Sequence, residues 1–323
     1  MSEDIETFLE GTPFAKWRMQ DIAGDASSRS YSRLFGPSDK TAILMNASHS
    51  PHGETEKFIH IAKSLREAGL AAPEILAFDT HKKWIILEDL GVTDVASAVE
   101  DAVVRPLDCY SAIGGVLIQL CDVHIPNLPT MDAANFAKLL EPLGLHYGPN
   151  PIEIGCIQEE IQSCYDQLGL MPDTLALRDF HAENLIWRSG EYGTDRVGLL
   201  DFQDALYAPA GYDLASLTRD ARRDVSPEIT AALTSKLATF LERDHFVFSA
   251  QVALIAVQRN LRILGVFAKL VKHDKKPSYG KFVPRVWQHI SKDLEHPALQ
   301  DLRASVQRKI PAPTPTFIEG WSQ

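Results

Sequence analysis

Residues 175–204 read LALRDFHAENLIWRSGEYGTDRVGLLDFQD, and the rest of the chain can be interpreted outward from them. Apolar residues lead into Asp179, and Asn184 follows five positions later. Two short extended apolar runs come next and predict a β-hairpin, and the second run ends at Asp201. The stretch therefore predicts a loop that carries a carboxylate and an amide, backed by a hairpin and followed by a second carboxylate.

Carboxylate and amide groups in this order suit phosphoryl transfer from ATP. One carboxylate can orient the acceptor hydroxyl and take its proton, while an amide oxygen and another carboxylate can hold Mg²⁺ on the triphosphate. We therefore predict Asp179 as a catalytic residue and Asn184 and Asp201 as metal ligands. The alternative is that they are turn residues, because short polar side chains often bond nearby backbone amides. A second carboxylate at the end of a strand, one hairpin away, favours the functional interpretation.

Composition and charge limit the class of protein. The chain has 323 residues, of which 45% are hydrophobic and 23% charged, as in a globular protein of one large or two medium domains. A net charge of -11 argues against binding to nucleic acid or to an anionic membrane. The acidic N-terminus lacks the apolar segment of a secretory signal, and polar residues interrupt the most apolar segment, 246–271. The four cysteines form no C-x-x-C pair. We therefore expect a cytoplasmic monomer with reduced thiols and no nucleic-acid or membrane partner.

The first part of the chain predicts a β-rich region with one main helix. We expect a leading helix at 1–18 and another at 55–69, where apolar residues recur at helical spacing. Short apolar runs bounded by turn residues predict strands, which we place at 20–22, 29–35, 41–45, 74–78 and 84–87.

From residue 94 onward helical spacing dominates. The sequence predicts an α+β protein with two lobes: a β-rich, nucleotide-binding N-lobe at 1–90 and a larger, mainly α-helical C-lobe at 91–323 with the catalytic loop and the acceptor site. The Pro-rich residues 310–316 are expected to form a surface strap. Helices of the C-lobe are expected at 110–124, 131–140, 152–168, 227–243, 248–271 and 283–294, and another begins at 212.

A turn of small residues precedes the second expected strand. Residues 24–29 read GDASSR, and a turn of this kind can lay backbone amides and hydroxyls over phosphates. Gly24, Ser27 and Ser28 are therefore candidate nucleotide-binding residues. An ordinary hairpin loop is the alternative, because the turn carries one glycine only.

With these residues in place, the chain resembles the aminoglycoside phosphotransferase and choline kinase superfamily, which has a protein-kinase-like fold. Within the superfamily it is most similar to the bacterial N-acetylmuramate/N-acetylglucosamine anomeric kinases of peptidoglycan recycling. The resemblance covers about residues 21–290, and its last block is the most specific. The blocks that carry it are 24–34 (GDASSRSYSRL), the pair 178–184 and 201–205, and 258–268 (QRNLRILGVFA).

The resemblance implies roles at matching positions. It implies the catalytic and metal-binding roles given above for the three residues of the motif. Residues 87–90, which include Glu88 and Leu90, fall at the hinge whose backbone would meet adenine. Asp213 matches an aspartate of the family that we interpret as structural, bracing the catalytic loop.

The chain departs from the family pattern at two places. Leu177 replaces a histidine two residues before the catalytic aspartate, which suits a packing role. The expected strand 41–45 has no lysine where kinases pair one with the α- and β-phosphates. We therefore expect Arg29 or Arg33 to supply the cation. Glu56 would be the helix carboxylate of the kinase ion pair, although it has no lysine to meet.

Three polar residues near the motif have two interpretations each. His181 is expected to orient its neighbours rather than to act as acid or base. Arg178 could steady the γ-phosphate or the loop, and a structural ion pair is the alternative. Asp204 could reach a second magnesium or the sugar, and a helix cap is the alternative.

Arg259, Asn260 and Arg262 interrupt an otherwise apolar helix. They could lie on the helix face that meets water. In the functional alternative, Arg259 and Asn260 bind the substrate, and the guanidinium of Arg259 forms a bidentate contact with a sugar acid or phosphate group. The lactyl carboxylate of muramate is such a partner, whereas a polycationic aminoglycoside would be repelled.

Together these features predict an enzyme that uses ATP and Mg²⁺ to phosphorylate the C1 hydroxyl of an amino sugar, such as N-acetylmuramate or N-acetylglucosamine, in cell-wall sugar recycling. One alternative is a kinase for an aminoglycoside, a choline-like amine or another small alcohol. Another is a nucleotide-binding pseudokinase with a regulatory role. The missing strand lysine favours the pseudokinase, and the complete motif of Asp179, Asn184 and Asp201 disfavours it.

Overall fold

The computed structural model describes residues 3–22 and 29–322. Packing divides the chain into two compact units, of which the first runs to Val116 and includes Ala182–Asp204, while the remaining segments form the second. The segment 182–204 belongs to the first unit because its hairpin is bonded there: Leu199 N–H donates to the Ala71 carbonyl at 2.9 Å. The lobes at 1–90 and 91–323 stay a prediction.

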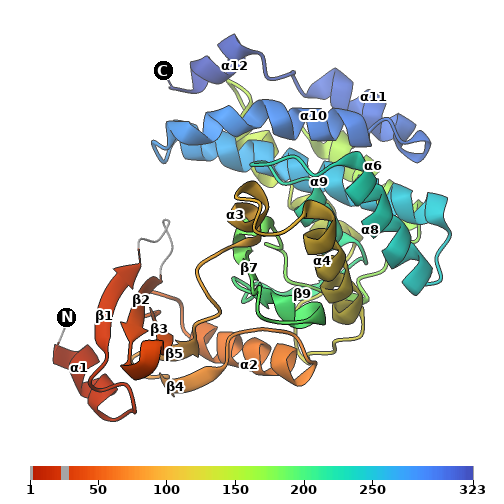
Figure 1. Ribbon diagram of the computed structural model, residues 1–323. Coiled ribbons are helices and arrows are strands. Elements are labelled where there is room, and N and C mark those ends of the chain that lie inside the picture. The colour runs from red at the N-terminus through yellow and green to blue at the C-terminus, as the bar shows by residue number, and fades with distance from the viewer. Residues whose placement is uncertain (1–2, 23–28, 323) are drawn as a thin grey trace. The chain divides into compact units, whose positions relative to one another are not determined.

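The first unit contains a five-stranded antiparallel sheet in the order β1-β2-β3-β5-β4 (Figure 1). Leu34, Leu44, Trp84 and Ile86 pack on one face of it with Leu9 and Phe14. The central strands are the most buried because both of their faces are covered. The strands are β1 (Arg18–Ile22), β2 (Ser30–Phe35), β3 (Thr41–Asn46), β4 (Ile75–Asp79) and β5 (Trp84–Glu88), and the 3₁₀ turn η1 (Pro37–Asp39) joins β2 to β3.

The leading helix is shorter than predicted. Helix α1 (Glu3–Glu10) ends where the sequence continues with Gly-Thr-Pro, and residue 18 already begins β1. Thr12 closes the turn through its backbone N–H and its hydroxyl, which both donate to the Leu9 carbonyl. A helix over 1–18 is therefore wrong beyond Glu10, because glycine and proline interrupt the helical hydrogen bonds.

Helix α2 (Glu54–Glu67) and a small hairpin complete the first unit. Helix α2 follows Gly53, whose φ of 85° suits glycine, and it buries Phe58 and Leu65. At Gly198 in the hairpin an added Cβ would lie 2.9 Å from Leu90 Cδ1, so the absent side chain lets the hinge segment approach. The other elements are α3 (Val95–Glu100), η3 (Ala182–Asn184), β7 (Leu185–Trp187), η4 (Gly193–Arg196) and β8 (Val197–Leu199).

The second unit is mainly helical. Its strands β6 (Thr174–Ala176) and β9 (Leu206–Ala208) pair antiparallel and flank the predicted catalytic loop. Helix α4 (Pro106–Cys121) runs across the division of the chain. The other elements are α5 (Ala133–Lys138), η2 (Leu143–Tyr147), α6 (Gly155–Gln167), α7 (Tyr212–Thr218), α8 (Pro227–Phe240), α9 (His245–Lys272), η5 (Pro277–Phe282), α10 (Val283–Asp293), η6 (Pro297–Leu299), α11 (Gln300–Lys309), α12 (Pro315–Glu319) and η7 (Gly320–Ser322).

Helix α9 is the centre of this unit, and α7, α8, α10 and η2 pack around it (Figure 1). Its contact with η2 is close, because a Cβ added at Gly265 would lie 2.2 Å from the Leu143 backbone nitrogen. Most of α9 is buried. The polar residues Gln258, Arg259 and Asn260 in the middle of the helix therefore lie inside the unit, whereas His245 and Lys269 near its ends are exposed.

The Pro-rich tail is exposed along most of 311–316 and is held at both ends. Ile310 and Trp321 are buried, and the Tyr147 hydroxyl donates to the Pro311 carbonyl at 2.9 Å. This arrangement agrees with a surface strap. Among the helices of the described residues, none is long and apolar enough to cross a bilayer.

Candidate functional site

A cavity of about 470 Å³ lies within the first unit, between the sheet, α2 and the β7–β8 hairpin. Its polar lining includes Tyr31, Asn184 and Asp201. An apolar lining with a few convergent polar groups is typical of a site for a small organic ligand. The apolar side chains of the lining are Ile22, Ile43, Phe58, Pro73, Leu87, Leu90, Val92, Ile186, Leu200 and Phe202.

The two predicted metal ligands meet in this cavity. Asn184 Nδ2 lies 3.5 Å from Asp201 Oδ2, and Gln203 Nε2 donates to Asp201 Oδ1 at 2.8 Å. Asp201 has a φ of 55°, which is unusual for a residue with a side chain. The next residue, Phe202, is buried and stacks on Phe58 at 4.9 Å, so packing holds this turn in place.

The hinge segment next to this cavity is fixed by an ion pair. Arg33 Nε donates to Asp89 Oδ2 at 2.7 Å, and Arg33 Nη2 lies 3.3 Å from Asp89 Oδ1. The Glu88 side chain accepts from Arg66 at 2.9 Å. Arg33 therefore ties β2 to the hinge, and Leu90 lines the cavity beside it.

Arg29 directly precedes β2 and pairs with helix α2. Its Nη2 is 3.4 Å from Glu54 Oε2. The helix carboxylate that meets an arginine is thus Glu54 rather than Glu56, which is exposed. The predicted phosphate-binding residues Gly24, Ser27 and Ser28 lie outside the described residues, so their role stays a prediction.

In the second unit the predicted catalytic loop is held by α7. Asp213 Oδ2 accepts from the Leu177 backbone N–H at 2.6 Å, and Oδ1 accepts from that of Arg178 at 3.0 Å. The Ser216 hydroxyl donates to the Arg178 carbonyl at 3.2 Å. The expected bracing role of Asp213 is confirmed. These contacts stabilise Arg178 at a φ of 73°, a conformation that costs free energy in a residue with a Cβ.

Asp179 lies in the turn that this clamp supports. Its backbone N–H donates to the Leu177 carbonyl, and its carbonyl accepts from His181 N–H, both at 3.0 Å. The side chains of Asp179 and His181 are half-buried. The turn is thus fixed through its backbone while Asp179 keeps access to solvent, as a proton acceptor requires.

Burial raises the pKa of Asp213 to about 6. The two backbone donors and the guanidinium of Arg259 act in the opposite direction, and burial outweighs them. At neutral pH Asp213 is therefore an ionised acceptor for both amides. It takes up a proton at a pH where an exposed carboxyl is still ionised.

Arg259 is buried, with 8% of its surface exposed, so the water-facing alternative is wrong for this residue. Its Nη2 donates to the Ser216 hydroxyl at 2.7 Å, and its guanidinium lies 4.6 Å from the centre of the Tyr212 ring. Arg259 therefore supports the loop through Ser216. Asn260 is 1% exposed, and its Nδ2 finds no hydrogen-bond partner among the residues that the structure describes. Their substrate-binding roles stay predictions.

A second cavity, of about 530 Å³, lies within the second unit beside the loop. Arg178, Arg262 and Lys138 line it, against the single carboxylate of Glu141. Burial lowers the pKa of Arg262 from its ordinary value, and Arg178 and Arg259 act in the same direction. The cavity thus gathers positive charge in partly desolvated surroundings. The other lining residues are Pro129, Thr130, Met131, Asn135, Leu139, Pro142 and Leu206.

Sequence reasoning did not identify Lys138 as a site residue, because it comes from a short helix with no motif. Asp204 is exposed and precedes strand β9, so the helix-cap alternative for it is excluded. Whether Asp204 reaches metal or sugar stays a prediction.

Residues 18–244, more than half of the chain, match the profile of the phosphotransferase enzyme family. The chain belongs to this family.

Two relatives resemble this phosphotransferase over most of its length. The N-acetylmuramate/N-acetylglucosamine kinase of Caulobacter vibrioides is 31% identical, in a match that covers 95% of this chain and 96% of that protein. The N-acetylmuramate/N-acetylglucosamine kinase of Pseudomonas aeruginosa is 28% identical, with 83% and 81% covered. The prediction of a phosphotransferase enzyme is confirmed.

Solved structures confirm the protein-kinase-like fold. A choline/ethanolamine kinase family protein from Mesorhizobium loti superposes with a TM-score of 0.64 at 13% identity, covering 95% of this chain and 99% of that one. An ADP-bound aminoglycoside phosphotransferase superposes with a TM-score of 0.59 at 14% identity, covering 92% and 98%. The α+β class, with a β-rich N-terminal part and a larger helical part, is confirmed as well.

Membership of this family implies that the phosphotransferase uses ATP, typically with a divalent metal ion. The residues in the first cavity fit such an ion. Asn184 and Asp201 supply an amide oxygen and a carboxylate, the hard oxygen ligands that Mg²⁺ prefers. Rotating the Asn184 amide exchanges its nitrogen and oxygen, so the contact with Asp201 is compatible with joint ligation.

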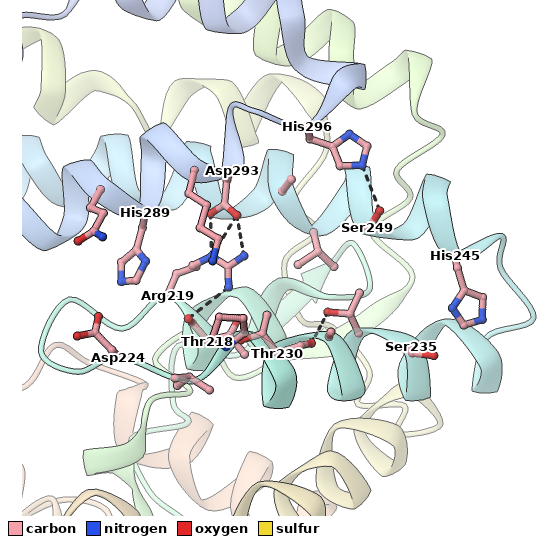
Figure 2. Close-up of a pocket in the computed structure, with 18 residues that line it drawn as sticks. Thr218, Arg219, Asp224, Thr230, Ser235, His245, Ser249, His289, Asp293 and His296 are labelled. Carbon is pink, nitrogen blue, oxygen red and sulfur yellow. Dashed lines mark hydrogen bonds and ion pairs between the residues drawn. The ribbon is translucent and has the colours of Figure 1, made fainter. Parts of the chain in front are cut away.

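Another cleft of about 610 Å³ lies between α8, α9 and α10 (Figure 2). Arg219 and Asp293 form a bidentate ion pair across it, at 2.6 and 2.8 Å. Arg219 directly follows α7, so the pair ties the end of that helix to α10. None of the described residues predicted for the site lines this cleft.

Proposed function

We propose that this phosphotransferase transfers the γ-phosphoryl group of ATP to the C1 hydroxyl of an amino sugar, such as N-acetylmuramate or N-acetylglucosamine. The names of its relatives from C. vibrioides and P. aeruginosa support a sugar acceptor. The observation that carries the proposal is the excess of positive charge around the second cavity, where Arg178, Arg262 and Lys138 outnumber Glu141. An acceptor with a carboxylate, as in muramate, complements that charge.

In the proposed reaction Asp179 orients the acceptor hydroxyl and takes its proton. The C1 hydroxyl of a sugar hemiacetal is more acidic than an ordinary alcohol, so a carboxylate suffices as the base. Asp213 and Ser216 hold the backbone on either side of Arg178, which fixes the turn that carries Asp179. His181 contributes by closing the turn through its backbone.

On the donor side, Asn184 and Asp201 would hold Mg²⁺. The ion, when bound, neutralises oxygens of the triphosphate and stabilises the charge that develops during transfer. The backbone of the hinge, at Glu88 and Leu90, would meet adenine, and the apolar lining of the cavity would cover its faces. Gly24, Ser27 and Ser28 would lie over the phosphates.

On the acceptor side, Arg262 and Arg178 would meet the acidic group of the sugar. Arg259 would act on the acceptor indirectly, through the loop it supports, with Asn260 beside it in α9 and Asp204 as a further polar contact. A cationic aminoglycoside or choline would be repelled by this lining. We place the reaction in cytoplasmic recycling of cell-wall sugars.

The proposal is tested by incubating the protein with Mg·ATP and a panel of acceptors and recording the ³¹P NMR spectrum. We expect a sugar 1-phosphate, recognisable from the coupling between phosphorus and the C1 proton, with N-acetylmuramate and N-acetylglucosamine. Choline, ethanolamine and an aminoglycoside serve as matched alcohol controls and should remain unmodified. Phosphate on a different hydroxyl, or transfer to the amines alone, would refute the proposal.

A further inference from the structure

The carboxylate of Asp201 has a different partner on each of its two oxygens. Its Oδ2 lies 3.5 Å from Asn184 Nδ2, and its Oδ1 accepts a hydrogen bond from Gln203 Nε2 at 2.8 Å. The first contact joins the two residues that fit a metal ion. The second comes from a neutral side chain that lines the same cavity. All three residues belong to the first unit.

Packing fixes the backbone of this turn but not the side chain of Asp201. Phe202 is buried and stacks on Phe58, with 4.9 Å between the ring centres, which anchors the chain next to Asp201. Asp201 itself is exposed, so hydrogen bonds rather than packed neighbours restrain rotation about its side-chain bonds. Gln203 supplies such a bond from two residues along the chain.

The orientation of the Gln203 amide is determined by this carboxylate. An ionised carboxylate only accepts hydrogen bonds, so the Nε2 end of the amide faces Asp201 and the Oε1 end faces away. Oε1 is buried and meets no hydrogen-bond donor among the residues that the structure describes. The bond to Asp201 therefore selects one orientation of the amide, and Oδ1 is the oxygen that it engages.

Engaging Oδ1 affects which ion Asp201 can hold. Mg²⁺ requires near-octahedral geometry with short bonds, whereas Ca²⁺ accepts flexible geometry and carboxylates that bind through one or both oxygens. A carboxylate that is held with Oδ2 beside Asn184 suits the stricter ion. Side chains that orient a metal ligand in this way typically change metal affinity about 10- to 100-fold.

We propose that Gln203 is a positioning residue for the metal site: it holds Oδ1 of Asp201 and so presents Oδ2, next to Asn184, to Mg²⁺ as a single-oxygen ligand. This assignment rests on the proposed function in that it takes Asn184 and Asp201 as the residues that hold the ion. Gln203 acts through Asp201 and contacts neither the ion nor the phosphates. Its hydrogen bond favours Mg²⁺ over Ca²⁺.

The assignment is tested by calorimetric titration of ADP into the whole protein in EDTA, in saturating Mg²⁺ and in saturating Ca²⁺. ADP is not turned over, so the gain in its affinity on adding a metal ion reports on the metal site without catalysis. Gln203→Met keeps the length of the side chain and removes its donor. The gain from Mg²⁺ should fall about tenfold and the gain from Ca²⁺ less than about threefold. The affinity in EDTA should be unchanged.

Gln20→Met, at an exposed glutamine of β1 in the same unit, is the matched control and should change neither gain. If circular dichroism shows that Gln203→Met does not fold, Gln203→Asn takes its place. Its amide is one methylene shorter, so the two gains should change in the same directions by a smaller amount. If the bond only closes the turn, these variants lower both gains by the same factor or leave both unchanged. Either result overturns the assignment.

Asp201→Asn separates this inference from the proposed function. If it abolishes the gain from Mg²⁺ while Gln203→Met preserves it, Asp201 keeps its proposed role and the assignment of Gln203 is wrong. If Asp201→Asn retains the full gain, the proposed metal ligand is wrong, and the assignment of Gln203 falls with it. The acceptor is absent from every titration, so a failure to phosphorylate sugars bears on the proposed function alone.

Discussion

The two cavities differ in whether the arginines that line them are paired with carboxylates. In the first unit Arg33 lines the cavity and is paired with Asp89. In the second unit Arg178 and Arg262 line the cavity, and neither forms an ion pair with a carboxylate of the described chain. A paired guanidinium mainly fixes the shape of a site, whereas a partly desolvated one without a counterion attracts an anion from solution. The comparison supports the proposal that the second unit binds the acidic group of the acceptor.

The largest effect should come from the loop beside the second cavity. Asp179→Asn removes the proposed base and should lower kcat about 10³-fold, within the range for general-base catalysis. Binding of Mg·ATP should be unchanged, because the residues of the nucleotide cavity belong to the first unit. Single-turnover kinetics and calorimetry measure the two quantities. Asp166→Asn, an exposed aspartate on α6, is the control. Substantial turnover by Asp179→Asn would remove this residue from the mechanism.

The next effect distinguishes acceptors. Arg262→Ala should raise the KM for N-acetylmuramate about 10- to 100-fold, because it deletes a charge-assisted contact in a partly buried cavity. The KM for N-acetylglucosamine, which has no carboxylate, should change only a few-fold. Steady-state assays with both sugars give the ratio, and Arg303→Ala, an exposed arginine of α11, should leave it unchanged. Equal losses for the two sugars would contradict the charge-based comparison.

A smaller effect should appear with pH. Because the pKa of Asp213 is raised to about 6, acidification should protonate it and release one of the two backbone N–H groups that it holds. One unit below that pKa, kcat should be about tenfold lower through this group, by the fraction that stays ionised. A pH–rate profile of the wild type should show this fall in kcat. Asp213→Asn should lower kcat at every pH and should not show this fall at acid pH. If the fall persists in the variant, another group is responsible for it.

The same titration has the opposite sign for stability. Burial raises the pKa of Asp213 above its ordinary value of 3.8, so between those two pH values the folded chain binds more protons than the unfolded chain. Lowering the pH through about 6 therefore stabilises the fold with respect to this group. The loss of activity should thus occur without a fall in melting temperature over the same range, which differential scanning calorimetry can check.

The smallest effect on catalysis should come from breaking an ion pair that lies outside both cavities. Arg219 in the cleft of Figure 2 is bonded to Asp293, whose side chain is 4% exposed. Asp293→Ala should lower the free energy of unfolding by about 3 kcal/mol, since it leaves a mostly buried guanidinium without its partner. KM for both substrates should stay within about twofold, because a stability change alone shifts no contact with substrate. A large change in KM would show that this cleft communicates with the site.

The residues that the sequence could identify are those whose roles depend on neighbours in the chain. Asn184 and Asp201 are separated by one hairpin, so their spacing predicted that they meet, whereas the bracing role of Asp213 was expected from its match to the family. The resemblance suggested Glu56 as the helix carboxylate of the kinase ion pair, with no lysine to meet, and the carboxylate of α2 that pairs with Arg29 is Glu54.

The sequence could not predict which polar residues of the C-terminal helices are buried. Arg259 and Asn260 interrupt an apolar helix, and no local pattern distinguishes a helix covered on all sides from one with a face in water. Lys138 joins Arg178 and Arg262 only through tertiary packing of separate segments. The helix expected over 1–18 ends at Glu10, because Gly11 and Pro13 interrupt helical hydrogen bonding beyond that residue.

Helix α9 carries both Arg259, which supports the loop, and Arg262, which lines the cavity proposed for the acceptor, and residues three apart are neighbours on the surface of a helix. If the proposed roles hold, substitutions on this helix that change acceptor preference should also disturb the loop that carries Asp179. Diversification among relatives with new acceptors should instead accumulate at Lys138, which lines the same cavity from the short helix α5. For engineering of acceptor preference, Lys138 and α5 are the residues to vary first.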